Sequence, residues 1–91
     1  MKSIFIVIDV DEDFSEPIIS AVSEELAIKE LDKWCGFGES ENVILIEDKV
    51  ITYDKEYQGS LIRKRSYKTK SFFGEIYLNN FEIYILDLIE Q

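Results

Sequence analysis

The fold is decided by the stretch KSIFIVIDVDEDFSEPIISAVSEELAIKELDKWCG, residues 2–36, in which two apolar runs precede an amphipathic segment. Lys2–Val10 is almost unbroken isoleucine, phenylalanine and valine, which predicts an inner strand with apolar side chains on both faces. Ile18–Val22 predicts a short second strand, close enough in sequence to pair with the first as an antiparallel hairpin. The polar residues between them would form the turn.

A helix over Glu24–Cys35 is predicted from its ends and its periodicity. Ser23 is a favourable N-cap, and the two glutamates after it suit the positive end of the helix dipole. Gly36 can take the left-handed conformation that ends a helix. Apolar residues at helical spacing form the stripe expected to face the core: Ala27, Leu31, Trp34 and Cys35.

Beyond the helix, short apolar runs predict further antiparallel strands. Val43–Ile46 and Lys49–Tyr53 flank Glu47-Asp48 and are typical of a second hairpin. Leu61–Phe73 alternates weakly, which indicates either a long exposed strand or an arm.

Asn79-Asn80 is suited to a two-residue type I′ turn, because asparagine tolerates positive φ. That turn would place one set of apolar residues on the same side of a last hairpin: Ile76, Leu78, Phe81, Ile83 and Ile85. The sequence therefore predicts one α+β domain over residues 1–91, with a mostly antiparallel sheet of about five to seven strands and one main helix, residues 24–35, packed on it.

Charge is distributed unevenly along this acidic chain, whose net charge is −9. Residues 57–74 hold five basic residues and no acidic one, whereas acids dominate elsewhere. Two groups are the predicted partner-binding residues. The acidic connection, residues 9–16, contributes Asp9, Asp11, Glu12, Asp13 and Glu16. The basic block, residues 63–70, contributes Arg63, Lys64, Arg65, Lys68 and Lys70.

Several kinds of catalytic chemistry lack their usual residues. The chain contains no histidine, which removes the commonest general base and transition-metal ligand. The single cysteine, Cys35, falls at the C-terminal end of the predicted helix, where the dipole disfavours a thiolate. No phosphate-binding glycine loop or zinc-ligand spacing is present. We therefore predict a binding protein with no cofactor rather than an enzyme.

The compartment is predicted from the cysteine count and the hydropathy pattern. One thiol cannot build an internal disulfide framework, which favours a reducing compartment. No apolar run approaches the roughly 20 residues that span a bilayer. We expect a cytoplasmic protein with no membrane partner.

Asp9, Asp11 and Asp13 alternate, so on an extended chain their carboxylates would point the same way. One alternative function is therefore a carboxylate-based site for a divalent cation. The sequence does not complete the two known aspartate motifs nearest to it. Asp13 stands where haloacid dehalogenases carry Thr or Val, and Phe14 and Ser20 replace the Gly and Glu of an EF-hand loop.

The basic block allows three further interpretations. Its lysines and arginines, interleaved with Tyr67, Phe72 and Phe73, are of the kind that bind nucleic acid, although the net charge of −9 opposes a polyanion. They would also protect an exposed edge strand from aggregation. Basic residues on both sides of the segment predict that neither face is deeply buried. Pairing of the basic block with the acidic connection of a second copy would give a two-fold homodimer.

The start IFIVIDVDEDFSEPIISAVSEELAIKEL, residues 4–31, resembles the start of small uncharacterised phage and bacterial proteins. These run strand, polar turn, short strand and then a helix that opens Ser-x-Glu-x-Ala or similar, as Ser23–Ala27 does here. The resemblance implies no catalytic residue. By analogy with small acidic phage proteins, the leading hypothesis is a protein-binding module that inhibits a host nucleic-acid-processing protein by contacting it through the acidic connection.

Overall fold

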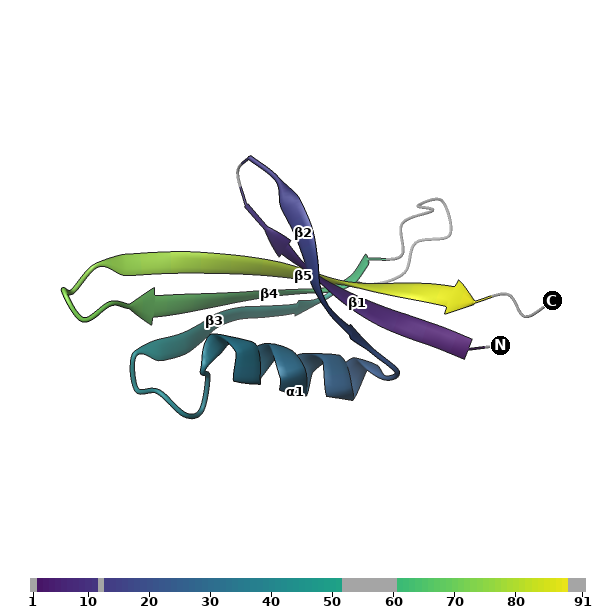
Figure 1. Ribbon diagram of the computed structural model, residues 1–91, viewed down its shortest axis with the longest axis horizontal. Coiled ribbons are helices and arrows are strands. Elements are labelled where there is room, and N and C mark those ends of the chain that lie inside the picture. Colours follow the sequence, from purple (N-terminus) through teal and green to yellow (C-terminus); the bar gives the residue numbers. More distant parts are fainter. Residues whose placement is uncertain (1, 12, 52–60, 89–91) are drawn as a thin grey trace.

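A computed structural model describes residues 2–11, 13–51 and 61–88. These residues form a five-stranded antiparallel sheet with one helix packed on it, which confirms the α+β class (Figure 1). In chain order the elements are β1 (Lys2–Val10), β2 (Ser15–Ala21), α1 (Glu24–Cys35), β3 (Val43–Val50), β4 (Leu61–Lys70) and β5 (Ile76–Leu88). The strand order β2-β1-β5-β4-β3 makes β5 the middle strand.

The first hairpin and the helix follow the predictions closely. β1 pairs antiparallel with β2, which begins three residues earlier than predicted. The bounds of α1 are those predicted, with the Ser23 side chain accepting a hydrogen bond from the Leu26 amide at 3.1 Å. Gly36 ends the helix at a φ of 79°, a conformation that an L-residue adopts only with strain.

The prediction of a hairpin at Glu47-Asp48 is wrong, because both residues lie inside the continuous strand β3. Their strand conformation is supported by β4, where Arg65 is the register partner of Asp48 and carries the opposite charge. A register shift between Leu45 and Glu47 accommodates one extra residue in β3. Residues 52 and 53 of the predicted second strand lie outside the described residues.

The prediction of a turn at Asn79-Asn80 is also wrong. Both asparagines lie within β5 and bond to β4, since Asn79 Nδ2 donates to Thr69 Oγ1 at 3.3 Å and Ser66 Oγ donates to Asn80 Oδ1 at 2.7 Å. The turn lies at residues 71–75 instead, where Gly74 supplies the positive φ of 84°. Glycine takes this conformation at lower cost than asparagine, so the turn forms around Gly74. Merging each of these two predicted hairpins into one strand leaves five strands.

Among the described residues, strand alternation gives the sheet one face under α1 and one face without a helix. The buried core lies under α1 and consists of Val7, Ala21, Ala27, Leu31, Val43, Tyr67, Phe81 and Ile83. The side chains between these positions point to the opposite side, which we call the helix-free face. On β5 the actual turn therefore separates Ile76 and Leu78, on the helix-free face, from Phe81 and Ile83 in the core.

The sheet continues beyond β1 as a narrower arm. Val10, the last residue of β1, and Ser66 of β4 are both register partners of Asn80, so they lie level on either side of β5. Past this level β1 gives way to the acidic connection, while β4 and β5 continue to their turn. We call residues 67–79 the arm; Figure 1 shows it extending away from the end of β1.

Candidate interaction surface

The basic block is divided between the two faces, because β4 lies between β5 and β3 and its side chains alternate. Arg65 lies on the helix-covered face and is only 5% exposed. The prediction that neither face of this segment is deeply buried is therefore wrong. Lys64, Lys68 and Lys70 lie at the alternate positions, on the helix-free face.

The guanidinium of Arg65 forms ion pairs with two acidic side chains and a hydrogen bond with a tyrosine hydroxyl. Its Nη2 lies 2.8 Å from Asp32 Oδ1 on α1, and its Nη1 lies 2.9 Å from Asp48 Oδ2 on β3. Its Nε donates to the Tyr67 hydroxyl at 2.8 Å. Burial lowers the pKa of Arg65, but the hydrogen bonds to Tyr67 and Asp32 outweigh it, so the pKa is raised and the side chain stays charged. The guanidinium thus joins the helix to two strands.

Tyr67 is fully buried beside this arginine. Its hydroxyl donates to Asp32 Oδ1 at 2.5 Å. Burial raises the pKa of Tyr67, and the bond to Asp32 adds to the rise. Its ring packs edge-on against Phe37 and Phe81, with centroids 5.9 and 5.7 Å away. Tyr67 is therefore a neutral structural residue of the core rather than a surface ring for stacking on a base.

Arg63 is also paired within the chain. Its Nη1 lies 3.0 Å from Asp48 Oδ2, and its Nε lies 2.9 Å from Glu24 Oε1. The Nε contact lacks hydrogen-bond geometry, so it is an ion pair only. Both arginines of the basic block have acidic partners, which leaves its lysines as the basic groups available on the surface.

The lysines border exposed apolar residues on the helix-free face. A groove of about 250 Å³ is lined by Ile44, Ile76, Lys68, Lys70, Glu41 and Asn42. Ile44, Ile76 and Leu78 are 54, 57 and 62% exposed, and Phe72 and Phe73 at the turn are 96 and 87% exposed. Lys64 is the lysine farthest from the turn, 3.9 Å from Glu82.

The exposed apolar residues of the arm did not emerge from the sequence pattern. The predicted Asn79-Asn80 turn assigned Ile76 and Leu78 to the same side as the core residues Phe81 and Ile83. The dipeptide Phe73-Gly74 was the available signal, because glycine favours the positive φ of the true turn. Moving the turn to this position reverses the side on which Ile76 and Leu78 lie.

The acidic connection is only partly extended. Asp9 is the one candidate aspartate within β1, where it pairs with Glu16 of β2, while Asp11 and Asp13 follow the end of the strand. The expected alternation of three carboxylates on one extended strand is therefore wrong. Glu12 lies outside the described residues. In the described ranges, no three Asp, Glu, Cys or His side chains are grouped so that they could hold a metal ion.

Asp9 and Cys35 lie near each other at the C-terminal end of α1. A cavity of about 220 Å³ is lined by Asp9, Trp34, Cys35, Thr69, Asn79 and Phe81. Burial, and then the neighbouring charges of Asp11 and Glu16, raise the pKa of Asp9. Burial raises the pKa of Cys35 to about 11, and Asp32 adds to this rise, so the thiol is neutral near pH 7. Trp34 is 62% exposed at the cavity rim, so its prediction as a buried stripe residue is wrong.

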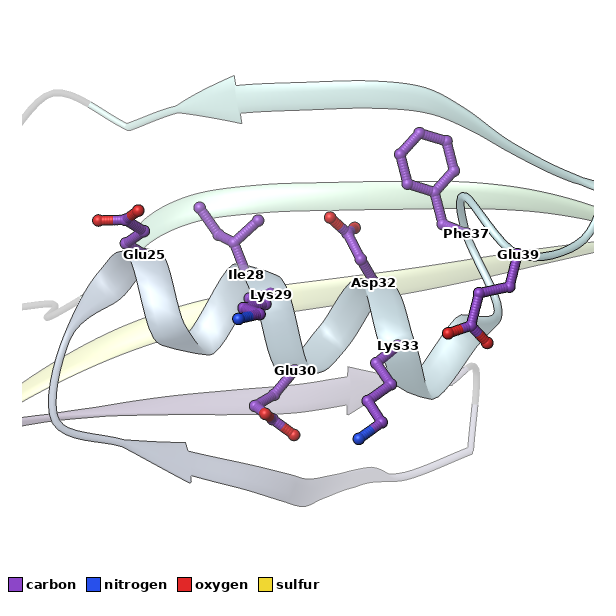
Figure 2. Close-up of a pocket in the computed structure, with 8 residues that line it drawn as sticks. All are labelled: Glu25, Ile28, Lys29, Glu30, Asp32, Lys33, Phe37 and Glu39. Atoms are coloured by element: carbon purple, nitrogen blue, oxygen red, sulfur yellow. The ribbon is translucent and has the colours of Figure 1, made fainter.

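A larger groove of about 660 Å³ runs beside α1 (Figure 2). Figure 2 shows Ile28, Asp32 and Phe37 on one side of the helix, and Glu30 and Lys33 pointing to the other. Its remaining lining residues are Glu25, Lys29 and Glu39. Asp32 is already bound to Arg65 and Tyr67, so the carboxylate nearest the sheet has a structural role.

Comparison with known proteins finds no matching family model, curated protein or solved structure. In the described part of the chain, no helix is long and apolar enough to cross a membrane.

Proposed function

We propose that this protein is a protein-binding module whose main contact surface is the helix-free side of the arm. The observation that carries the proposal is the exposure of Ile44, Ile76 and Leu78 next to a turn with two exposed phenylalanines. Adjacent exposed apolar residues on a small protein are typical of interaction sites, whereas single ones are common everywhere. Aromatic side chains in such a patch are frequent anchors of protein interfaces.

Lys68 and Lys70 define the chemistry of the partner. They lie beside Ile44 and Ile76 around one groove, so the surface suits a partner that presents apolar residues with carboxylates at the rim. A protein partner is favoured over nucleic acid for two reasons. Arg63 and Arg65 are neutralised within the chain, and the net charge of −9 repels a polyanion.

The acidic connection is the second contact surface in this proposal. Asp11, Asp13 and Glu16 are exposed, and so is Phe14, at 63%. Acids beside an exposed aromatic ring would suit a basic cleft on a partner, which is the interaction expected of an inhibitor of a nucleic-acid-processing protein. The surface of the arm has the opposite charge, so the two surfaces would select different chemical features.

Site-specific photo-crosslinking tests the arm directly. A photoreactive phenylalanine derivative replaces Leu78, and the matched control carries the same residue at Lys29, which is exposed on α1. Irradiation in cells that produce the protein should give discrete protein adducts from position 78 and none from position 29. The proposal is wrong if position 78 gives no adduct, or gives the same adducts as the control.

A further inference from the structure

We infer that the cavity at the C-terminal end of α1 binds a guanidinium group, supplied by an arginine side chain of the partner. Residues from four elements line this cavity: Asp9 of β1, Trp34 and Cys35 of α1, Thr69 of β4, and Asn79 and Phe81 of β5. The inference rests on the second contact surface of the proposed function, because Asp9 is the first residue of the acidic connection.

The strand register brings the polar residues of the cavity together on the helix-covered face of the sheet. Asp9 is the register partner of Phe81, whose ring belongs to the core under α1. Asn79 is the register partner of the buried Tyr67, so it lies on the same face. Its amide nitrogen donates to Thr69 Oγ1 at 3.3 Å. Asn79 therefore offers its amide oxygen to a ligand as an acceptor, beside the carboxylate of Asp9.

The charges around the cavity favour a cation. Asp9 supplies a carboxylate, and the negative end of the α1 dipole adds to it. No basic residue is among the described residues that line the cavity. Lys33, the basic residue in the last turn of α1, lines the groove beside the helix instead, and Arg65 is already paired with two carboxylates. A cation from another molecule would therefore complete this cavity.

A bound cation would also reverse the unfavourable environment of Asp9. Burial and the charges of Asp11 and Glu16 raise the pKa of Asp9, so its ionised form is disfavoured in the protein alone. An opposite charge close to a carboxylate favours the ionised form. The same carboxylate thus opposes folding near pH 7 and favours binding, which is a common combination at binding sites.

The ring of Trp34 favours a guanidinium over an ammonium. It lies at the rim of the cavity, and the side chain is 62% exposed. A guanidinium is planar and weakly hydrated, so it stacks on an aromatic ring more readily than a strongly hydrated ammonium does. The chain already holds one guanidinium between a ring and a carboxylate, since Arg65 Cζ lies 5.6 Å from the centroid of Tyr67 and Arg65 Nη2 lies 2.8 Å from Asp32.

The size of the cavity fits this group. Its volume is about 220 Å³. The four heavy atoms of a guanidinium replace about four waters, which occupy about 120 Å³ at about 30 Å³ each. The remaining volume accommodates the adjacent methylene groups, so the cavity suits the end of an arginine side chain.

Fluorescence titration tests the site without any partner protein. Trp34 is the one tryptophan of the chain, so its emission reports on the cavity directly. The probe is N-acetyl-arginine amide, and N-acetyl-lysine amide is the comparison, with the ionic strength held constant. Asp9→Asn removes the carboxylate of the cavity. Asp13→Asn is the matched control, because it removes the same charge from a described residue of the acidic connection that does not line the cavity. Circular dichroism melting checks that both variants fold.

We expect the arginine probe to change the emission of the wild type saturably, with a dissociation constant in the millimolar range because one side chain makes few contacts. Asp9→Asn should raise this constant at least about tenfold, since charge-assisted hydrogen bonds are strong. Asp13→Asn should raise it less than about twofold, because a more distant exposed charge is screened. The lysine probe should bind at least about threefold more weakly than the arginine probe.

The absence of a saturable change in the wild type would overturn the inference, and so would equal affinities of the wild type and Asp9→Asn. A lysine probe that binds as tightly as the arginine probe would overturn the assignment of a guanidinium. The titration and the crosslinking at position 78 are independent measurements. Adducts from position 78 without a change in Trp34 emission would overturn this inference and leave the contact surface of the arm standing.

Discussion

The basic residues of β4 have different surroundings on the two faces of the sheet. On the helix-covered face, Arg65 is 5% exposed and contacts Asp32, Asp48 and Tyr67. On the helix-free face, Lys68 and Lys70 line an open groove with exposed apolar residues. The comparison shows that a continuous basic sequence can supply an internal ion-pair network and a contact surface at once, because strand alternation separates the two sets.

The largest expected difference between the faces concerns two apolar residues of β5. Ile83→Ala removes a fully buried side chain and should lower the free energy of unfolding by about 2–5 kcal/mol. Leu78→Ala truncates a side chain that is 62% exposed, and should change the free energy of unfolding by no more than about 0.5 kcal/mol. Urea denaturation of the two variants under the same conditions measures both changes. Equal losses would show that other parts of the chain cover the helix-free face.

A smaller difference is expected between basic residues of β4. Arg65→Met leaves the partly buried Asp32 without its cation and Asp48 with Arg63 alone, and should destabilise the fold by about 2–3 kcal/mol. Lys68→Met should alter stability by at most about 0.5 kcal/mol, since its side chain lies in an open groove. Chemical denaturation of the two variants under the same conditions provides the measurement. A small loss of stability in the Arg65 variant would mean that the ion pairs contribute little to stability beyond packing.

The smallest expected effect is a pH dependence at Asp9. Its pKa is raised in the folded protein by burial and by Asp11 and Glu16, so the ionised carboxylate destabilises the fold near pH 7. Asp9→Asn should therefore stabilise the protein at pH 7, by less than about 0.5 kcal/mol. The wild type regains this stability as the pH falls through the folded pKa, so the difference should disappear below the ordinary value of 3.8. Thermal melts of the wild type and of Asp9→Asn at pH 7 and below pH 3.8 measure this difference in stability. A difference that is the same at both pH values would show that it does not come from ionisation of Asp9.

The sequence predicted the parts of the fold that depend on local signals. The caps of α1, Ser23 and Gly36, fix its ends by hydrogen bonding and by a positive φ, and both are readable from residue type. The sequence predicts both ends of β1, because a continuous apolar run of this length has few alternative secondary structures. The α+β class follows from these elements and the strands after them.

The parts that the sequence did not predict depend on pairing between distant segments. Asn79 and Asn80 are favourable turn residues, but their hydrogen bonds to Thr69 and Ser66 keep them within β5. Charge alone likewise did not distinguish Arg65 from Lys68, because Asp32 and Asp48 become neighbours only through the fold. The candidate residues of both charged segments thus came from the sequence, whereas the face on which each one lies came from the structure.

The central position of β5 has a consequence for how the protein is made. β5 follows the other strands in the chain, yet it is the strand that joins β1 and β2 on one side to β3 and β4 on the other. During synthesis the two earlier hairpins, β1–β2 and β3–β4, have no shared partner until β5 leaves the ribosome. Pairing across such sequence distances is slow to form. The sheet should therefore close only once β5 has been synthesised, and the apolar faces of the two hairpins are open to chaperones until then.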